Sequence, residues 1–332
     1  MAPVEDGQLP LSYDLTSDAI IGMRIAVLGY GAQGQSHALN LRDSGAEVIV
    51  GLPSTATRYL AACDAGFTVL SPKAAVQDAR LVAMLVPDEV MAEVYTAIEP
   101  ALRAPCGLVF AHGFALHYGA VRPRADLDAI LVAPKGQGKA VREAYLRGSG
   151  VPGLLAVHQD VSGHAKELAA AYAAALGCGR CGVLEVTVAE ETEADLVSEQ
   201  AVLCGGITQL VKTGFEVLVE AGFPPEVAYF ECLHELKLVV DLLHSGGLVG
   251  MHQGISNTAE FGALQSGALF QQLPLRAAMH EILASVRSGD FSKRWLTEAS
   301  TGMPMLQLAR QQTANHPIEV VGARLRSRMQ QA

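Results

Sequence analysis

The stretch RIAVLGYGAQGQSHALNLRDSGAEVIVGL, residues 24–52, decides the fold. It reads as a short apolar strand, three glycines at Gly29, Gly31 and Gly34, a helix that ends near Gly45, and a second apolar strand. In this order, the first glycine permits a tight turn, the second lets backbone approach a pyrophosphate, and the third packs helix on strand. The stretch predicts a dinucleotide site; a phosphate-free α/β turn is the alternative.

Further strands alternate with helical segments as far as residue 186. They are expected at 80–86, 107–112, 129–133, 153–158 and 181–186. From about residue 187 the strand signal stops, and helices are expected near 190–204, 206–221 and 225–245. We therefore predict an α/β Rossmann-like doubly wound sheet in residues 1–186 and an all-helical domain in residues 187–332.

The residues of the loop after the second strand are expected to determine whether the chain binds NAD or NADP. An NAD site usually carries an acid there to bind the ribose hydroxyls. The sequence instead reads GLPSTATR at 51–58, with Ser54, Thr55, Thr57 and Arg58 and no acid. Hydroxyls and a guanidinium suit a 2′-phosphate, which favours NADP over a merely solvated loop.

Two polar side chains follow other strands of the predicted sheet. His112 lies in AHGF and Lys135 in APKGQGK, each just after an apolar run. Ligands of such sheets bind at the carboxyl ends of the strands. Each residue alone is more often a surface residue than a catalytic one, but together beside a nucleotide site they are candidates for catalysis.

The helical half carries two pairs of acids beside apolar residues. Asp195 and Glu199 lead into an apolar segment, and like charges four residues apart on a helix repel by roughly 0.2–0.5 kcal/mol. In a helical projection of 226–243, Glu231 and Glu235 fall among apolar residues, away from the face that carries Lys237. Carboxylates so placed need a cation, and Mg²⁺ or Mn²⁺ is the natural choice.

Two alternatives explain the acids without such a site. Separate salt bridges to Lys or Arg are one, although the segment after Glu199 offers no such partner along the helix. A ferritin-like di-iron bundle is the other, because Glu231 and His234 form E-x-x-H. That scaffold needs the motif twice, and Glu199 has no His three residues later.

Composition narrows the class of protein. The net charge is −10, which argues against nucleic acid and anionic membranes as partners. The N-terminus has neither a basic start nor an apolar core, and no uninterrupted apolar run reaches ~18 residues, so we expect a cytoplasmic protein. Of the six cysteines, Cys63, Cys106, Cys204 and Cys232 are expected as reduced core residues, and Cys178 and Cys181 as thiols in a turn rather than a redox pair.

Taken together, several motifs resemble ketol-acid reductoisomerase of the short class I form. They are GYGAQGQSHALNLRDSG, AHGF, APKGQG, ETEADLVSEQAVLCGG, AYFECLHELKLVVDL and ISNTAEFG, which extend over nearly the whole chain. The resemblance implies branched-chain amino acid synthesis: a metal-assisted alkyl shift of a 2-aceto-2-hydroxy acid, then NADPH reduction to a 2,3-dihydroxy acid. It also implies two Mg²⁺ ions and a homodimer, or a higher oligomer, with shared active sites.

The resemblance assigns roles residue by residue. Asp195 would bridge both ions, Glu199 would bind one, and Glu231 and Glu235 of the partner chain would serve the second and assist proton movement. Ser256 would contact the substrate carboxylate, Lys135 the reacting oxygens, and His112 would be catalytic or positioning. The expected coenzyme contacts are Gly29, Tyr30, Gly31, Ala32, Gln33, Gly34, Ser54, Arg58, Asp88, Glu89, Val90, Met91 and Gly138.

The chain departs from the family pattern around the coenzyme. Gln137 and Lys139 stand in a segment that usually reads GPGH, Gln35 stands where His is frequent, and Pro53 and Ala56 replace usual phosphate ligands. These changes put coenzyme preference and substrate size in question. A paralogue for a related 2-hydroxy-2-acyl acid, a metal-independent NADP hydroxy-acid dehydrogenase and a catalytically silent homologue remain as alternatives, although the retained acids and Lys135 speak against the last two.

Overall fold

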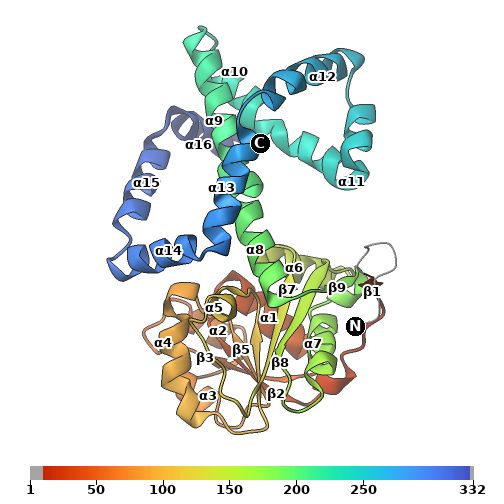
Figure 1. The fold of residues 1–332 in the computed structure, drawn as a ribbon, viewed down its shortest axis with the longest axis vertical. Coiled ribbons are helices and arrows are strands. Elements are labelled where there is room, and N and C mark those ends of the chain that lie inside the picture. Colours follow the sequence, from red (N-terminus) through yellow and green to blue (C-terminus); the bar gives the residue numbers. More distant parts are fainter. Residues whose placement is uncertain (1–9, 330–332) are drawn as a thin grey trace. The chain divides into compact units, whose positions relative to one another are not determined.

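The computed structural model describes residues 10–329 and divides into two units between Ala194 and Asp195. The division falls inside helix α8 (Val188–Ser198), so this helix begins in the first unit and ends in the second. Figure 1 shows a sheet with helices on its faces in the first unit and helices in the second. The predicted class, a Rossmann-like sheet followed by a helical domain, is confirmed.

One mixed sheet of nine strands forms the first unit, in the order β1-β9-β8-β7-β6-β5-β2-β3-β4. The strands are β1 (Leu11–Ser12), β2 (Arg24–Leu28), β3 (Glu47–Gly51), β4 (Thr68–Leu70), β5 (Leu81–Met84), β6 (Gly107–Phe110), β7 (Asp128–Pro134), β8 (Gly153–Gln159) and β9 (Val183–Glu185). Strands β2 to β7 pair in parallel, whereas β8 runs antiparallel to β7 and β1 antiparallel to β9. The edge strands β1 and β4 escaped prediction because two or three residues show no periodicity.

Helices cover both faces of this sheet, and each face has its own core. Side chains alternate along β2, so that Ile25 and Val27 pack into one core and Ala26 and Leu28 into the other. The first core includes α1 (Ala32–Asp43) and α7 (Ala165–Ala175); the second includes α4 (Asp88–Ile98) and α5 (Phe114–His117). Burial on both faces explains why the central strands are mostly apolar.

Three further α-helices lie in the first unit: α2 (Tyr59–Asp64), α3 (Pro72–Ala75) and α6 (Gly138–Leu146).

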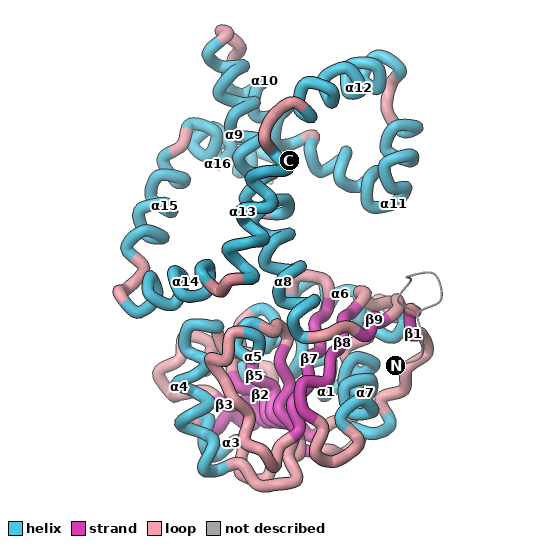
Figure 2. Tube along the Cα trace, in the orientation of Figure 1, coloured by secondary structure: helices cyan, strands magenta, loops and turns pink. Residues whose placement is uncertain are grey.

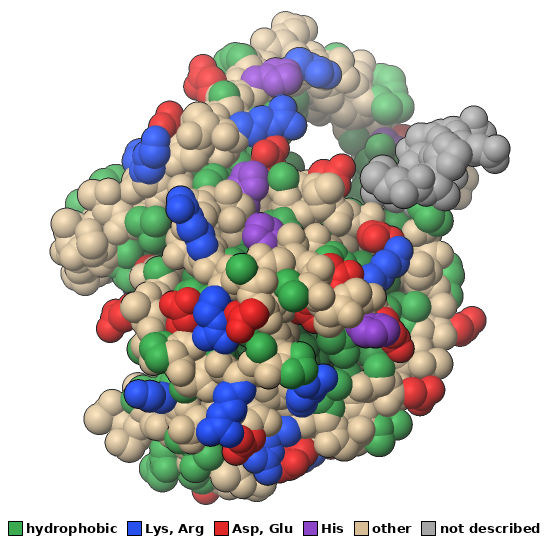
Figure 3. Space-filling model, turned by 60° about the horizontal axis from the view of Figure 1, so that its bottom comes forward, with side chains coloured by type: hydrophobic (Ala, Val, Ile, Leu, Met, Phe, Trp, Pro, Cys, Tyr) green, Lys and Arg blue, Asp and Glu red, His purple; other side chains and the backbone are tan. Residues whose placement is uncertain are grey.

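Charges of both signs are interspersed on the face shown in Figure 3. Arg24 donates to Glu47 at 2.7 Å, and Arg103 to Asp78 at 3.1 Å. Exposed pairs of this kind contribute about 1 kcal/mol or less, so the fold depends on the two cores.

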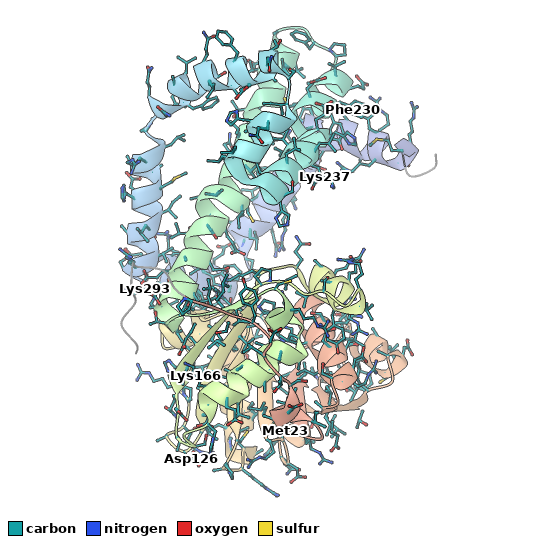
Figure 4. The ribbon with its side chains drawn as sticks, turned by 90° about the vertical axis from the view of Figure 1, so that its right-hand side faces the viewer. Met23, Asp126, Lys166, Phe230, Lys237 and Lys293 are labelled. Atoms are coloured by element: carbon teal, nitrogen blue, oxygen red, sulfur yellow. The ribbon has the colours of Figure 1, made fainter. Side chains whose placement is uncertain are left out.

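The second unit is helical in its described part, as the tube in Figure 2 shows. Its helices after α8 are α9 (Gly205–Glu220), α10 (Pro225–Tyr229), α11 (Leu236–Gly254), α12 (Asn257–Gln271), α13 (Leu275–Arg287), α14 (Asp290–Ser300), α15 (Pro304–Asn315) and α16 (Pro317–Met329). Its buried cluster holds Phe215, Ala228, Tyr229 and Ile318. Phe230, labelled in Figure 4, packs against this cluster.

The segment predicted as one helix near 225–245 is interrupted. A π-turn, η6 (Phe230–His234), separates α10 from α11, so the regular projection of 226–243 does not hold. Glu231 and Glu235 are exposed in the single chain rather than enclosed by apolar residues. Lys237, labelled in Figure 4, pairs with Asp241 on α11, as expected for a wet face.

The expectation for the cysteines is partly wrong. Cys106 is buried and Cys232 partly buried, but Cys63 and Cys204 are exposed. Cys63 lies on the outer side of the short surface helix α2, and Cys204 follows a π-turn, so an apolar neighbourhood in sequence did not mean burial. Cys178 and Cys181 lie in a turn as free thiols.

Candidate functional site

The glycine-rich turn after β2 has the backbone shape that a dinucleotide site needs. Gly29 has φ +97°, and a Cβ there would lie 2.3 Å from the Leu85 carbonyl oxygen. A Cβ on Gly34 would lie 2.3 Å from the Gly29 oxygen, so this glycine lets α1 approach the turn. A Cβ on Gly31 would meet no atom within 4 Å. Protein packing therefore explains two of the glycines and leaves open space above the third, where a pyrophosphate would approach.

Buried polar atoms around this turn also fit a bound coenzyme. Gln33 donates to the Gly136 carbonyl at 2.9 Å, which joins the turn to the loop after β7. The Gln33 amide oxygen is buried without a hydrogen-bond partner among residues 10–329. Gly31, the residue before α1, makes no side-chain cap, so the first N–H groups of α1 are available to an anion.

The other expected coenzyme residues lie at the carboxyl ends of β3, β5 and β7. Ser54 and Arg58 are exposed in the loop after β3. Asp88 and Glu89 form the first turn of α4. Two side chains face inward instead: Met91 is 4% exposed and Tyr30 is 3% exposed, so only their backbone could touch a ligand.

His112 and Lys135 meet at one buried carboxylate, that of Glu191. The Lys135 Nζ lies 3.0 Å from Glu191 Oε1, and His112 Nδ1 lies 3.2 Å from Glu191 Oε2. The Gly113 backbone N–H donates to Glu191 Oε2 at 3.0 Å. A Cβ on Gly113 would lie 2.1 Å from Thr192 Oγ1, so a glycine at this position allows the first turn of α8 to approach closely. The structure thus brings the two predicted strand-end residues together through a third.

Glu191 is charged although its side chain is only 1% exposed. Burial alone would disfavour the carboxylate, but the hydrogen bonds and positive charge of His112 and Lys135 outweigh burial and hold the pKa of Glu191 below its usual value. A buried carboxylate with three donors is a rigid anchor. It holds the Lys135 ammonium and the His112 ring at the carboxyl ends of β6 and β7.

Sequence reasoning missed Glu191. The segment ETEAD offers three acids in five residues, and nothing local shows which of them is buried. The signal was the spacing: Glu191, Asp195 and Glu199 recur every four residues, which places all three on one side of a continuous helix. Asp195 is partly exposed and Glu199 exposed, so both can reach a ligand.

A π-turn, η5 (Glu199–Leu203), follows the first acid pair, and two glycines permit it. The Cys204 N–H donates to the Glu199 carbonyl, five residues back, at 2.9 Å. A Cβ on Gly205 or Gly206 would lie 2.1 Å from the Gln200 or Ala201 oxygen. Any other residue would push the backbone apart. The CGG that follows the acids is therefore what inserts one extra residue into the helix, a feature frequent at functional sites.

The second acid pair lies at the other π-turn. Glu231 is within η6, and Glu235, the residue before α11, donates its N–H to the Phe230 carbonyl at 3.0 Å. In the described chain, no group of three or more ligand atoms within 4.8 Å includes Glu231 or Glu235. One chain therefore does not gather all four predicted acids. Ser256 is exposed and caps α12 by accepting from the Ala259 N–H at 3.2 Å.

Comparison with known proteins agrees with this geometry. Residues 19–182 match the model of the acetohydroxy acid isomeroreductase NADPH-binding domain, and residues 188–331 match the ketol-acid reductoisomerase C-terminal domain. A solved NADH-preferring ketol-acid reductoisomerase from an uncultured archaeon is 42% identical, with TM-score 0.94, over 96% of this chain and 99% of that chain.

More distant structures share the fold alone. A semialdehyde dehydrogenase NAD-binding protein from Cupriavidus necator is 19% identical, with TM-score 0.58, over 80% of this chain and 98% of that chain. A pyrroline-5-carboxylate reductase from Coxiella burnetii is 15% identical, with TM-score 0.55, over the same shares. The two domain matches and the 42% identical structure decide the family: the chain belongs to the ketol-acid reductoisomerases, which are nicotinamide-dependent oxidoreductases.

Proposed function

We propose that this chain converts a 2-aceto-2-hydroxy acid of the 2-acetolactate type to a 2,3-dihydroxy acid in branched-chain amino acid synthesis. The reaction combines a Mg²⁺-dependent alkyl migration with reduction by NADPH. The observation that carries the proposal is the Glu191 carboxylate, held by Lys135 at 3.0 Å and His112 at 3.2 Å, on a helix that continues into Asp195 and Glu199. A plain dehydrogenase has no use for that row of acids.

The protein's own groups account for binding and proton control. Lys135 is held by its ion pair with Glu191, and from there it would donate to a substrate oxygen and stabilise negative charge on it. Glu191 also orients the His112 ring through Nδ1. Both side chains retain access to ligands, with exposed fractions of 33% for Lys135 and 23% for His112.

The acids suit hard divalent cations. Asp195 on α8 and Glu199 at the start of η5 offer carboxylate oxygens, which is the donor set that Mg²⁺ takes. When bound, two Mg²⁺ ions supply Lewis-acid polarisation of the substrate's carbonyl and hydroxyl oxygens. We assign Asp195 as the bridging ligand and Glu199 as a ligand of one ion.

We assign the second acid pair of each site to a partner subunit. Glu231 and Glu235 join no ligand cluster within the described chain, although both are exposed. Large apolar side chains are also exposed on the helical unit, among them Leu210, Leu248 and Phe261. Exposed apolar surface of this extent is typical of a subunit interface, so a homodimer with shared sites accounts for both observations.

The exposed apolar surface of the helices also concerns the cellular location of the protein. Val188–Glu220 is long and apolar enough, by length and composition alone, to cross a membrane, and only 6% of its most apolar window is buried. We attribute this surface to subunit contact, because the run begins with the acids Glu191, Asp195 and Glu199. We propose a cytoplasmic location, and fractionation of cells expressing the full chain tests it.

The coenzyme we assign is NADPH. The loop after β3 has no acid, and Arg58 is exposed in it. The 42% identical relative prefers NADH, so the assignment depends on this chain's own loop. Oxidation of NADPH and of NADH with 2-acetolactate, with and without Mg²⁺, tests coenzyme, metal and substrate together. Turnover without divalent metal would instead indicate a plain hydroxy-acid dehydrogenase, and preference for a bulkier 2-hydroxy-2-acyl acid would indicate a specialised paralogue.

A mixing experiment tests the shared site. Asp195→Asn and Glu235→Gln chains are each expected to be inactive, and reassociation of an equal mixture should restore about a quarter of parent activity. Half the dimers are then mixed, and each has one intact site of two. No recovery with mixed dimers demonstrated by mass would place both acid pairs in one chain.

A further inference from the structure

A cavity of about 400 Å³ lies between the start of α1, the start of α6 and the loop after β3. It is lined by Gly31, Ala32, Gln35, Ser36, Leu39, Arg58, Gly138, Lys139, Arg142 and Glu143. All of these residues belong to the first unit, and the space is large enough for one phosphate or a pyrophosphate. Two of its walls are the beginnings of helices.

The two helix starts touch each other. A Cβ on Gly138 would lie 2.0 Å from the Ala32 carbonyl oxygen, so only glycine permits this approach. Neither the residue before α1, Gly31, nor the one before α6, Gln137, makes a side-chain cap. Two sets of uncapped N–H groups therefore converge beside the cavity, and both helix dipoles favour an anion there.

Three cations line the cavity, and their partners differ. Arg142 is committed to the fold, because it donates to Asn40 at 2.8 Å and to Asp43 at 2.6 Å. Arg58 has no ion-pair partner in the part of the chain that the structure describes. Lys139 is 88% exposed and lies 3.7 Å from Glu143, an exposed contact that is easily exchanged for a stronger one.

We propose that Lys139 is a further coenzyme-binding residue, and that with Arg58 and the two helix starts it binds a phosphate group of the dinucleotide. This rests on the proposed NADPH site and adds a second cation to it. The exposed Lys139 side chain can exchange its contact with Glu143 for one with the phosphate. Because Lys139 is solvent-exposed, its contribution should be moderate and should fall as salt screens it.

The test is calorimetric binding of 2′,5′-ADP and of ADP to the full chain, without substrate or metal. Lys139→Ala should weaken one or both nucleotides by about three- to tenfold, which is a range common for one charge-assisted hydrogen bond near a surface. Loss for 2′,5′-ADP alone would place Lys139 on the 2′-phosphate; equal loss for both would place it on the diphosphate. Lys139→Arg should restore most of the affinity.

Controls separate this proposal from the wider one. Lys73→Ala removes another exposed lysine, on α3, and should leave both nucleotides unchanged. Unchanged binding in Lys139→Ala, with the parent binding normally, overturns the role of Lys139 alone. If the parent binds neither nucleotide, the proposed coenzyme site is refuted, and the proposed role of Lys139 is refuted with it. A thermal melt shows that the variant is folded.

Discussion

The two units bury their apolar side chains to very different extents. In the first unit, two large cores enclose the sheet, and residues such as Leu28, Leu108 and Phe110 are wholly buried. In the second unit the buried cluster holds only Phe215, Ala228, Tyr229 and Ile318, while Leu248 is 72% exposed. A unit with so small a core cannot offset the entropy of ordering its helices by itself. The first unit has cores large enough to fold alone, whereas the second exposes apolar surface that the proposed subunit contact would cover.

The candidate site follows the same division. Glu191, Lys135 and His112 form their hydrogen bonds within the first unit. Glu199, Glu231 and Glu235 of the second unit, by contrast, are exposed in the single chain. Substitutions should therefore act through different quantities in the two units, namely stability and nucleotide affinity in one and metal binding and assembly in the other.

The largest effect is expected from Asp195→Asn. Loss of a bridging carboxylate disturbs both ions, so alkyl migration should fall by roughly a thousandfold while nucleotide binding is kept. Steady-state rates with 2-acetolactate and Mg²⁺ measure it, and Glu167→Gln on α7 is the matched control. Near-parent turnover would mean that this acid is not a metal ligand.

A leucine pair tests the difference in burial directly. Leu108→Ala should lower the free energy of unfolding by about 2–5 kcal/mol, because Leu108 is 0% exposed in a tight core. Leu248→Ala should cost roughly 0.5 kcal/mol or less in the separated chain and should instead weaken association. Urea unfolding at several protein concentrations distinguishes them. If both substitutions lowered the free energy of unfolding equally at every protein concentration, the proposed difference between the two units would be wrong.

Arg58→Ala probes the coenzyme loop of the first unit. A hydrogen bond to a charged group contributes about 1.5–3 kcal/mol, so kcat/KM for NADPH should fall roughly tenfold to a hundredfold while that for NADH changes little. Kinetics with both coenzymes in parent and variant give the answer. Equal losses, or a parent that prefers NADH, would show that the loop does not recognise the 2′-phosphate.

A further expected effect is a dependence of stability on pH that belongs to the first unit. Burial lowers the pKa of His37 from 6.5 to about 3, and its Nδ1 lies 3.0 Å from the Tyr172 hydroxyl. The unfolded chain therefore binds the proton first, so this stability is complete above pH 6.5 and is lost as pH falls toward 3. His37→Gln should flatten unfolding free energy against pH by up to about 1.4 kcal/mol per unit in that window.

The control for this slope is His164→Gln, which replaces an exposed histidine on the same unit. It should leave the profile between pH 6.5 and 4 as in the parent. An identical profile for His37→Gln would mean that His37 is protonated in the folded state.

The sequence by itself determined the elements with strong local signals. The glycine turn, the strand at Arg24–Leu28 and the change to helices follow from spacing and apolar runs, because turns and buried strands are encoded by neighbours in the chain. The four acids, His112 and Lys135 could also be named from motifs, and their roles are predictions that binding and kinetics must test.

Only the tertiary structure decided which carboxylate is buried and where the helices break. Glu191 is 79 residues from His112 in the sequence and 78 from Gly113, whose N–H donates a hydrogen bond to it. No local pattern therefore shows these contacts. The π-turn at Glu199–Leu203 needs Gly205 and Gly206 for space against carbonyls five residues back, which a regular 100° projection cannot represent. Periodicity describes one element at a time, whereas burial and register depend on what the rest of the chain packs against it.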